Sequence, residues 1–153
     1  MTISCSINLE SVLKQLDLLP SILLDEIKDS MQTAMDMVRD YAQENHRYKD
    51  QSGTLTKSIQ SSVSDDGNTG TVFTDDPAAS FVYYGTKAHF IAPANAKALH
   101  WQDPARGNLF SKGHMVKGIV GEKFIENAFA ANREEIIDLF TTGIQSAIDK
   151  AGF

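Results

Sequence analysis

The chain has 153 residues, a mass of 16.8 kDa and 42% hydrophobic residues, which suits one domain with its own core. Charged residues make up 22%, and no apolar run reaches the ~20 residues that a membrane span requires, so neither a disordered chain nor a membrane protein is expected. No basic stretch precedes an apolar one at the N-terminus, so we expect no secretion signal. The single cysteine, Cys5, allows no internal disulfide and suits a reducing cytosol.

The charge of the chain is unevenly placed. The net charge of −6 argues against a general nucleic-acid binder. Residues 87–117, however, carry five basic residues against one acid, so this segment is +4 and the remainder of the chain is −10. We expect basic loops on an acidic body, which could meet a phosphate backbone, an acidic surface on a neighbouring subunit, or only solvent. The five basic residues are Lys87, Lys97, Arg106, Lys112 and Lys117.

The first third of the chain is predicted to be helical. Residues 1–8 lack periodicity and are expected to form a short arm or an edge strand. Apolar positions at helical spacing then predict a short helix after Asn8, a favourable cap, and Pro20 stands where a second helix can begin. An apolar stripe from Ile27 to Ala42 predicts a helix of about 24 residues with an acidic outer surface.

The next segment is predicted to combine short helices with a hairpin. Leu55 and Ile59 are four residues apart, which indicates one helical turn running into a strand. The apolar positions of residues 59–63 and 72–73, joined through residues 65–68, predict a β-hairpin. Ser80 is expected to cap a short helix over residues 81–84, which Gly85 ends.

Residues 86–118 hold short apolar pieces between prolines and glycines, which predict two or three short strands joined by an exposed loop around 102–112. From Glu122 two apolar stripes predict a helical region with a break near Asn132. The order of these elements predicts a single α+β domain, in which a long N-terminal helix and a C-terminal helix pack on a small, mostly antiparallel sheet with an extended loop. Its parts are an arm (1–8), a helical region (9–50), a β-rich region (51–118) and a C-terminal helical region (119–153).

The sequence offers little support for a metal or cofactor site. His89, His100 and His114 are 11 and 14 residues apart, and neither a cysteine pair nor an HExxH motif accompanies them. These histidines are therefore expected to be polar loop residues, and we expect neither a metal nor another cofactor.

Catalytic motifs are equally weak, so the chain is not expected to be an enzyme. It has no GxSxG elbow, and Cys5 has no nearby basic neighbour in the sequence. The acidic pairs at residues 65–66 and 75–76 flank predicted strand ends, where aspartate commonly forms turns.

A GxxG sequence at residues 118–121 opens the last helical region, as in the RNA-binding KH loop. Its middle residues, Ile119 and Val120, are apolar, whereas such loops usually carry polar or basic residues there. No Walker lysine followed by Ser or Thr is present, which excludes a P-loop. We therefore expect a flexible glycine junction and keep a small nucleic-acid-binding regulator as an alternative.

Taken in order, the motifs resemble the neck and tail-completion proteins of long, non-contractile-tailed bacteriophages, the group that includes the minor tail protein Z type. The resemblance covers about residues 27–150. Its marks are Ser52-Gly53-x-Leu55 to Ile59, Tyr83-Tyr84-Gly85-Thr86, His89-x-Ile91-x-Pro93, Leu99-x-Trp101, and Gly118 to Phe124. Family members often carry His-Pro-Gly before the last helix, and here Met115-Val116-Lys117-Gly118 keeps only the glycine.

The resemblance implies a structural virion protein without catalytic activity, assembled in the bacterial host cytoplasm and located in the neck or tail. Copies would form a ring, of six or twelve, at the head–tail junction, next to other neck, connector and tail proteins. Double-stranded DNA would pass without specific binding, and no membrane is involved. A tail terminator that caps the tail tube is an alternative from the same virion.

The expected contact sites between subunits lie in the arm-like middle of the chain. Gly85 is expected to allow a backbone conformation that a side chain forbids, and Trp101 to lie either in the core or in an interface. Phe124 is expected in the core. The candidate interface residues are Gly85, Thr86, His89, Pro93, Trp101, Arg106, Lys112 and Lys117.

Overall fold

The structure, a computed structural model, describes residues 9–50 and 52–153, with side chains from residue 16 on. The chain divides into two compact units. The helical unit comprises Met1–His46, Asp50–Asp75 and Phe124–Phe153, and the arm unit comprises Arg47–Lys49 and Asp76–Lys123. The expected N-terminal arm of residues 1–8 lies outside the described residues. The single-domain organisation stays a prediction, which cooperative unfolding of both units would check.

Helix α1 (Leu9–Glu44) is one continuous helix of 36 residues, so the expectation of a second helix starting at Pro20 is wrong. Proline cannot donate a hydrogen bond to the carbonyl four residues earlier, that of Leu16. Because Leu16 and Pro20 are both exposed, water can satisfy this carbonyl. The Ser21 hydroxyl donates to the Leu18 carbonyl at 2.9 Å and supports the same turn. The helix therefore continues through the proline.

Two C-terminal helices pack on α1. Helix α4 (Phe124–Ala131) buries Phe124 and Ala128, and helix α5 (Arg133–Ala151) buries Gly143, Ala147 and Ala151 at intervals of four residues. This spacing forms a stripe of small residues on α5, which allows close approach of the two helix backbones. A Cβ on Gly143 would overlap the Ser30 hydroxyl of α1. The predicted break between α4 and α5 is confirmed at Asn132.

A hairpin completes the helical unit, as predicted. Strand β1 (Ile59–Val63) pairs antiparallel with β2 (Gly70–Thr74), and the hairpin contacts α1. A short helix, α2 (Thr54–Ser58), leads into β1. The Asp50 carboxylate accepts hydrogen bonds from the Gly53 and Thr56 amides, each at 2.8 Å, and these bonds hold the start of α2. Leu55 and Ile59 are both buried, which explains their four-residue spacing.

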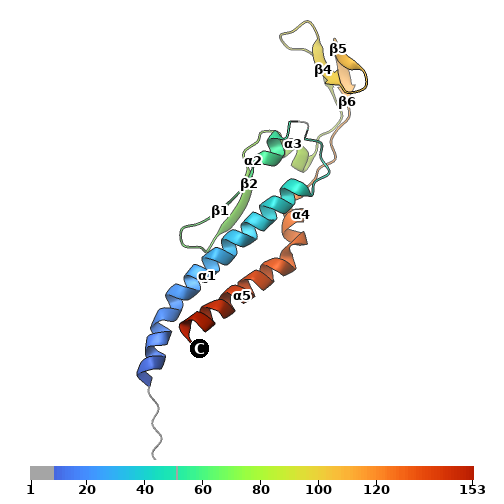
Figure 1. Ribbon diagram of the computed structural model, residues 1–153. Helices are drawn as coiled ribbons and strands as arrows, with labels where there is room; N and C mark the ends of the chain where they lie inside the picture. The colour runs from blue at the N-terminus through green and yellow to red at the C-terminus, as the bar shows by residue number, and fades with distance from the viewer. Residues whose placement is uncertain (1–8, 51) are drawn as a thin grey trace, which may run out of the picture. The chain divides into compact units, whose positions relative to one another are not determined.

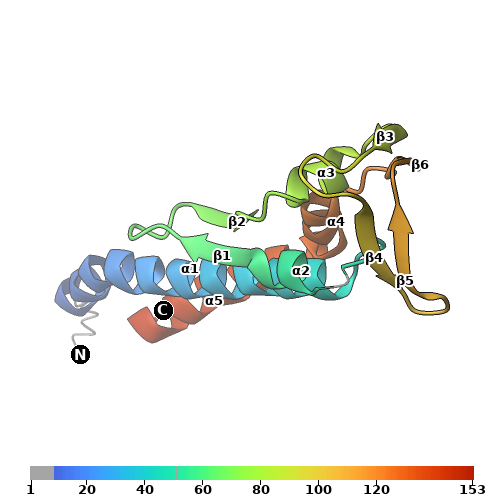
Figure 2. The same ribbon diagram turned by 90° about the horizontal axis from the view of Figure 1, so that it is seen from above.

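The arm unit contains one short helix and two antiparallel ladders (Figures 1 and 2). Helix α3 (Ala79–Tyr84) begins after Ala78, so Ser80 lies inside the helix and is not its cap. Instead the Asp76 carboxylate accepts a hydrogen bond from the Ala78 amide at 2.7 Å. Strand β3 (His89–Ile91) pairs with β6 (His114–Val116), and β4 (Leu99–Asp103) pairs with β5 (Gly107–Ser111).

The exposed loop expected at residues 102–112 is wrong in extent. Only residues 104–106 connect β4 and β5, because the Asp103 carboxylate accepts hydrogen bonds from the Ala105 and Arg106 amides, each at 2.9 Å, and closes a tight turn. Four strands therefore replace the two or three expected. The α+β class is confirmed, with helices packed together and strands in antiparallel ladders. No described helix is long and apolar enough to cross a membrane.

Candidate assembly surface

The arm, defined here as residues 87–117, starts and ends where two chain segments cross within the arm unit. The Thr86 amide donates to the Ile119 carbonyl at 2.9 Å, and the Ile119 amide donates to the Thr86 hydroxyl at 3.1 Å. The Glu122 amide donates to the Val82 carbonyl at 3.0 Å. We call the contact of residues 82–86 with residues 118–122 the base crossing. It fixes the two ends of the arm against each other.

Glycines allow this crossing. Gly85 has a φ of +77°, and a Cβ there would lie 2.6 Å from both the Gly121 nitrogen and the Ile119 oxygen. A Cβ on Gly118 would overlap the Thr86 carbonyl oxygen. The GxxG sequence is thus a packing motif. Two amides in this segment, those of Ile119 and Glu122, already donate within the chain and are not free for a phosphate.

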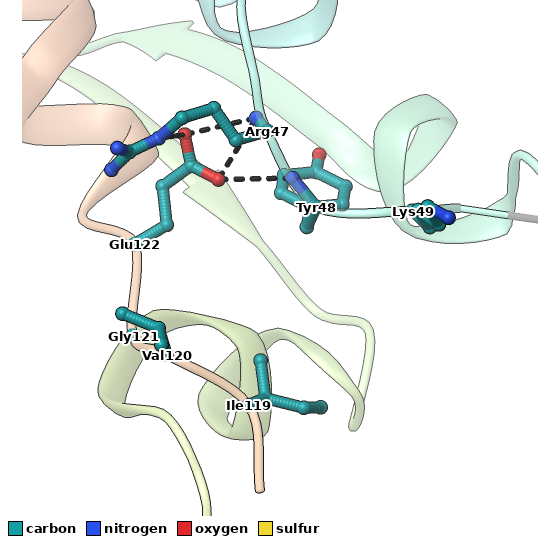
Figure 3. Close-up of a pocket in the computed structure, with 7 residues that line it drawn as sticks. All are labelled: Arg47, Tyr48, Lys49, Ile119, Val120, Gly121 and Glu122. Carbon is teal, nitrogen blue, oxygen red and sulfur yellow. Dashed lines mark hydrogen bonds and ion pairs between the residues drawn. The ribbon is translucent and has the colours of Figure 1, made fainter. Parts of the chain in front are cut away.

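A buried carboxylate ties residues 47–49 to the base crossing (Figure 3). Glu122 accepts hydrogen bonds from the Arg47 amide at 2.9 Å and the Tyr48 amide at 3.0 Å, and its second oxygen lies 3.4 Å from the Arg47 Nε. These contacts satisfy the charge of a buried side chain. A cavity of about 480 Å³ lies beside them, lined by residues 47–49 and 119–122.

The ladder formed by β3 and β6 leaves large apolar side chains uncovered. Phe90 and Met115 are direct partners across the ladder, and each is 62% exposed. The Phe90 ring lies against Gly113, where a Cβ would be 2.6 Å from the ring. Their strand neighbours Ile91 and His114 are only partly exposed. One face of this ladder is therefore apolar and open to solvent.

The hairpin of β4 and β5 presents a second apolar surface. Phe110 is 69% exposed and stacks on its cross-strand partner His100, with ring centroids 4.8 Å apart. The His100 Nε2 lies 3.1 Å from the Asn108 side-chain oxygen. Trp101 is 38% exposed, and its ring centroid lies 5.0 Å from that of His114. Exposed aromatic rings held by neighbouring side chains are common at protein–protein interfaces.

The arm unit is basic. It holds eight basic residues and three acids, a net charge of +5, and the helical unit is therefore −11. Within the described chain, none of the five basic residues of the arm makes an ion pair, and all five are exposed. The arm thus combines uncovered apolar side chains with uncompensated positive charge.

The predicted interface residues all lie in the arm or at the base crossing. Gly85 and Thr86 belong to the crossing, and Thr86 and His89 line an apolar cavity of about 370 Å³ with Ile119. Pro93 lies between β3 and β4, and Arg106 in the turn after β4. Trp101 is on β4, and Lys112 and Lys117 flank β6. Their role between subunits stays a prediction.

Sequence reasoning missed several residues of this surface. Phe90, Phe110 and Met115 lie in the short apolar pieces from which strands are predicted, and period-two alternation would place one member of each apolar pair outward. Glu122 and its contact with Arg47 were also missed. The two residues are 75 positions apart, and no local pattern links them. Among the described residues, no group of three His, Cys, Asp or Glu side chains is placed to hold a metal ion.

The arm therefore combines exposed apolar side chains with exposed positive charge. Residues 10–85, about half of the chain, match the model of the HK97-gp10-like family, described as "Bacteriophage HK97-gp10, putative tail-component". This match confirms the resemblance to phage neck and tail-completion proteins and supports a structural protein of a phage tail. Searches of the curated proteins and of the solved structures gave no match. The arm lies beyond the matched residues.

Proposed function

We propose that this protein is a structural, non-enzymatic subunit of a ring at the head–tail junction of a long-tailed phage, where it completes the neck or tail. The observation that supports the proposal most is the arm, which exposes aromatic side chains and positive charge on a chain that matches a tail component. A surface of this kind is suited to contact other subunits. Copies that contact each other head to tail close into a ring when the rotation between them is right.

The ring would hold six or twelve copies and contact neighbouring neck, connector and tail proteins. It would assemble in the host cytoplasm and let double-stranded DNA pass without specific binding. The strongly acidic helical unit is suited to line such a passage, since negative charge does not retain phosphates. A particle structure in which the basic arm lines the bore would contradict this arrangement.

The interface role proposed for the arm has a direct test at Trp101, a residue on β4 that is partly exposed. We expect Trp101→Ala to fold normally, because the Trp101 side chain is 38% exposed, and to reduce incorporation into particles. Circular dichroism measures folding, and immunoblotting of purified particles measures incorporation. An unfolded variant would instead assign Trp101 to the core.

Two alternatives remain distinct from this proposal. A tail terminator that caps the tail tube would have the same basic arm and the same family match. A small nucleic-acid-binding regulator is disfavoured by the base crossing, because the amides of Ile119 and Glu122 already donate within the chain. Binding to DNA or RNA with a steep dependence on salt would favour the regulator.

The experiment that tests the proposal is interruption of this gene in the parent phage, followed by negative-stain electron microscopy of the lysate. We expect DNA-filled heads beside finished but unattached tails. Tails of abnormal length would favour the terminator. Normal infectious particles would contradict a structural role in the virion.

A further inference from the structure

We propose that the arm of one copy docks on the outer face of helix α5 of a second copy, in a head-to-tail contact. This inference rests on the self-assembly in the proposed function and names the two surfaces that meet. The occupant of the arm is thus another copy of this chain. The proposal rests on three observations. The arm exposes apolar side chains and lysines, α5 exposes isoleucines and acids, and several acids of α1 already form ion pairs.

The arm needs a partner with an apolar centre and negative charge. Phe90, Met115 and Phe110 are each more than 60% exposed, and they lie among lysines without ion pairs in the described chain. Association that covers these side chains also brings Lys112 and Lys117 close to the partner. An acidic rim on the partner would offset the charge and set the orientation of the contact.

The outer face of α5 has these properties. Ile137 and Ile144 are 51% and 43% exposed, although most apolar side chains of helical proteins face a core. Glu134 and Asp138 are exposed on the same side of the helix, four residues apart, and neither makes an ion pair within the described residues. This face therefore pairs uncovered isoleucines with uncompensated acids.

Several acids of α1 are less suited to this role because positive side chains already neutralise them. Asp36 and Asp40 form ion pairs with Arg39, each at 2.7 Å, and Glu26 pairs with Lys150. Asp29 acts on Lys150, which also pairs with Glu26. Nearer the start of α1, Asp17 and Asp25 are exposed beside Leu18 and Leu24, which are 56% and 48% exposed. This face of α1 is the competing surface, and the charge exchange below includes it as a control.

A charge exchange tests the contact. The arm variant carries Lys112→Glu and Lys117→Glu, and the helix variant carries Glu134→Lys and Asp138→Lys. Each variant opposes like charges across the contact, so we expect its dissociation constant for self-association to rise at least tenfold in sedimentation velocity at low salt. The fourfold variant restores opposite charges and should associate within threefold of the wild type. An equimolar mixture of the two double variants should associate as well.

Matched controls separate this contact from a general effect of charge. Lys49→Glu with Lys57→Glu and Asp17→Lys with Asp25→Lys make the same changes in net charge outside the two surfaces. They should leave the dissociation constant within threefold of the wild type. Recovery in the fourfold variant also shows that the substitutions permit folding. Losses that the fourfold variant does not recover would overturn the proposal, and so would equal losses in the controls.

Position-specific cross-linking gives an independent readout. In a Cys5→Ser background, one chain carries Met115→Cys and a second carries Ile137→Cys. Under oxidation, disulfide-linked dimers of the two different chains should form in the mixture, several-fold above the dimers in each chain alone. Oligomers without this cross-link, or a wild type that stays monomeric at every concentration, would overturn the proposed contact. The lysate experiment judges the proposed function separately, because it asks only which particles assemble.

Discussion

The two units of this chain differ in how they use their apolar residues. Of the twelve buried hydrophobic residues among those described, eleven lie in the helical unit, and Ala79 is the one in the arm unit. The arm unit instead holds eight of the fifteen large hydrophobic residues that are exposed. The units also carry opposite net charge. The helical unit thus holds almost all of the buried core, and the arm unit holds more of the exposed large hydrophobic side chains.

Because of this difference, substitutions in the two units should affect different properties of the protein. A change in the helical unit alters the free energy of unfolding of the chain by itself. A change of an exposed side chain on the arm should leave folding almost unaffected and act on assembly. The following substitutions test that division, beginning with the largest expected effect.

Two phenylalanines compare the units directly. Phe124 is 1% exposed at the start of α4, and Phe110 is a surface residue of β5. We expect Phe124→Ala to lower the free energy of unfolding by about 3–5 kcal/mol because it leaves a cavity in the core. We expect Phe110→Ala to change it by less than about 0.5 kcal/mol. Urea denaturation measures both, and similar losses in the two variants would contradict the division between the units.

Two glycines with nearly the same positive φ test the base crossing. Gly85 and Gly107 have φ values of +77° and +75°, but a Cβ on Gly107 would meet nothing within 4 Å. Gly107→Ala should cost about 1–2 kcal/mol for the strained backbone. Gly85→Ala should cost about 1–3 kcal/mol more because its Cβ overlaps the chain at Gly121.

Hydrogen exchange at the Thr86 amide reports the stability of the crossing in these two variants. We expect faster exchange of this amide in Gly85→Ala and an unchanged rate in Gly107→Ala. Equal rates in both variants would show that the crossing does not depend on the missing side chain.

The loss of the buried Glu122 carboxylate is expected to have the next largest effect on the free energy of unfolding. Glu122→Gln replaces one acceptor oxygen with a donor that faces the Arg47 and Tyr48 amides, and it should cost about 1–3 kcal/mol in chemical denaturation. Glu134→Gln, at an exposed position of α5, serves as the control and should be neutral. A neutral result for Glu122→Gln would show that these amides find another partner.

The smallest expected effect is the change in melting temperature when the hydrogen bond to Asp36 in the helical unit is removed. A hydrogen bond from the Ser61 hydroxyl, aided by Gln32 and Arg39, holds the pKa of Asp36 below its usual value. The contribution of this carboxylate is therefore present above the unfolded pKa of about 4 and lost as the pH falls through the lower, folded value. Ser61→Ala should lower the melting temperature slightly at pH 7 and leave it unchanged near pH 2. A difference that persists at pH 2 would assign the effect to packing.

Local patterns predicted the helical unit well. The 3.6-residue stripes predicted most of α1 and α5, and the Asp65-Asp66-Gly67-Asn68 turn predicted the β1–β2 hairpin. The sequence wrongly predicts a new helix at Pro20. The energetic cost of proline inside a helix depends on whether water can reach the Leu16 carbonyl, and helix propensities do not include this exposure. Within this unit, chain neighbours largely decide the structure.

The arm unit was predicted less well because its contacts join distant parts of the chain. The pairing of β3 with β6 and the crossing of Gly85 with Gly121 span more than twenty residues. In the sequence these contacts are marked only by glycines. Glycines are also typical of flexible turns, so they do not identify the crossing. The candidate residues Arg106, Lys112 and Lys117 were correctly expected in a basic, exposed segment. The apolar side chains between them were not recognised as a surface.

The base crossing has a consequence for how such a chain can diversify. Because residues 85 and 121 approach closely, the two ends of segment 87–117 are held together. Exchange of this segment for a longer or differently charged one would add little loop-closure entropy and keep the hydrogen bonds of the base crossing. A changed sequence of residues 87–117 can thus alter the exposed side chains of the arm while the base crossing stays the same.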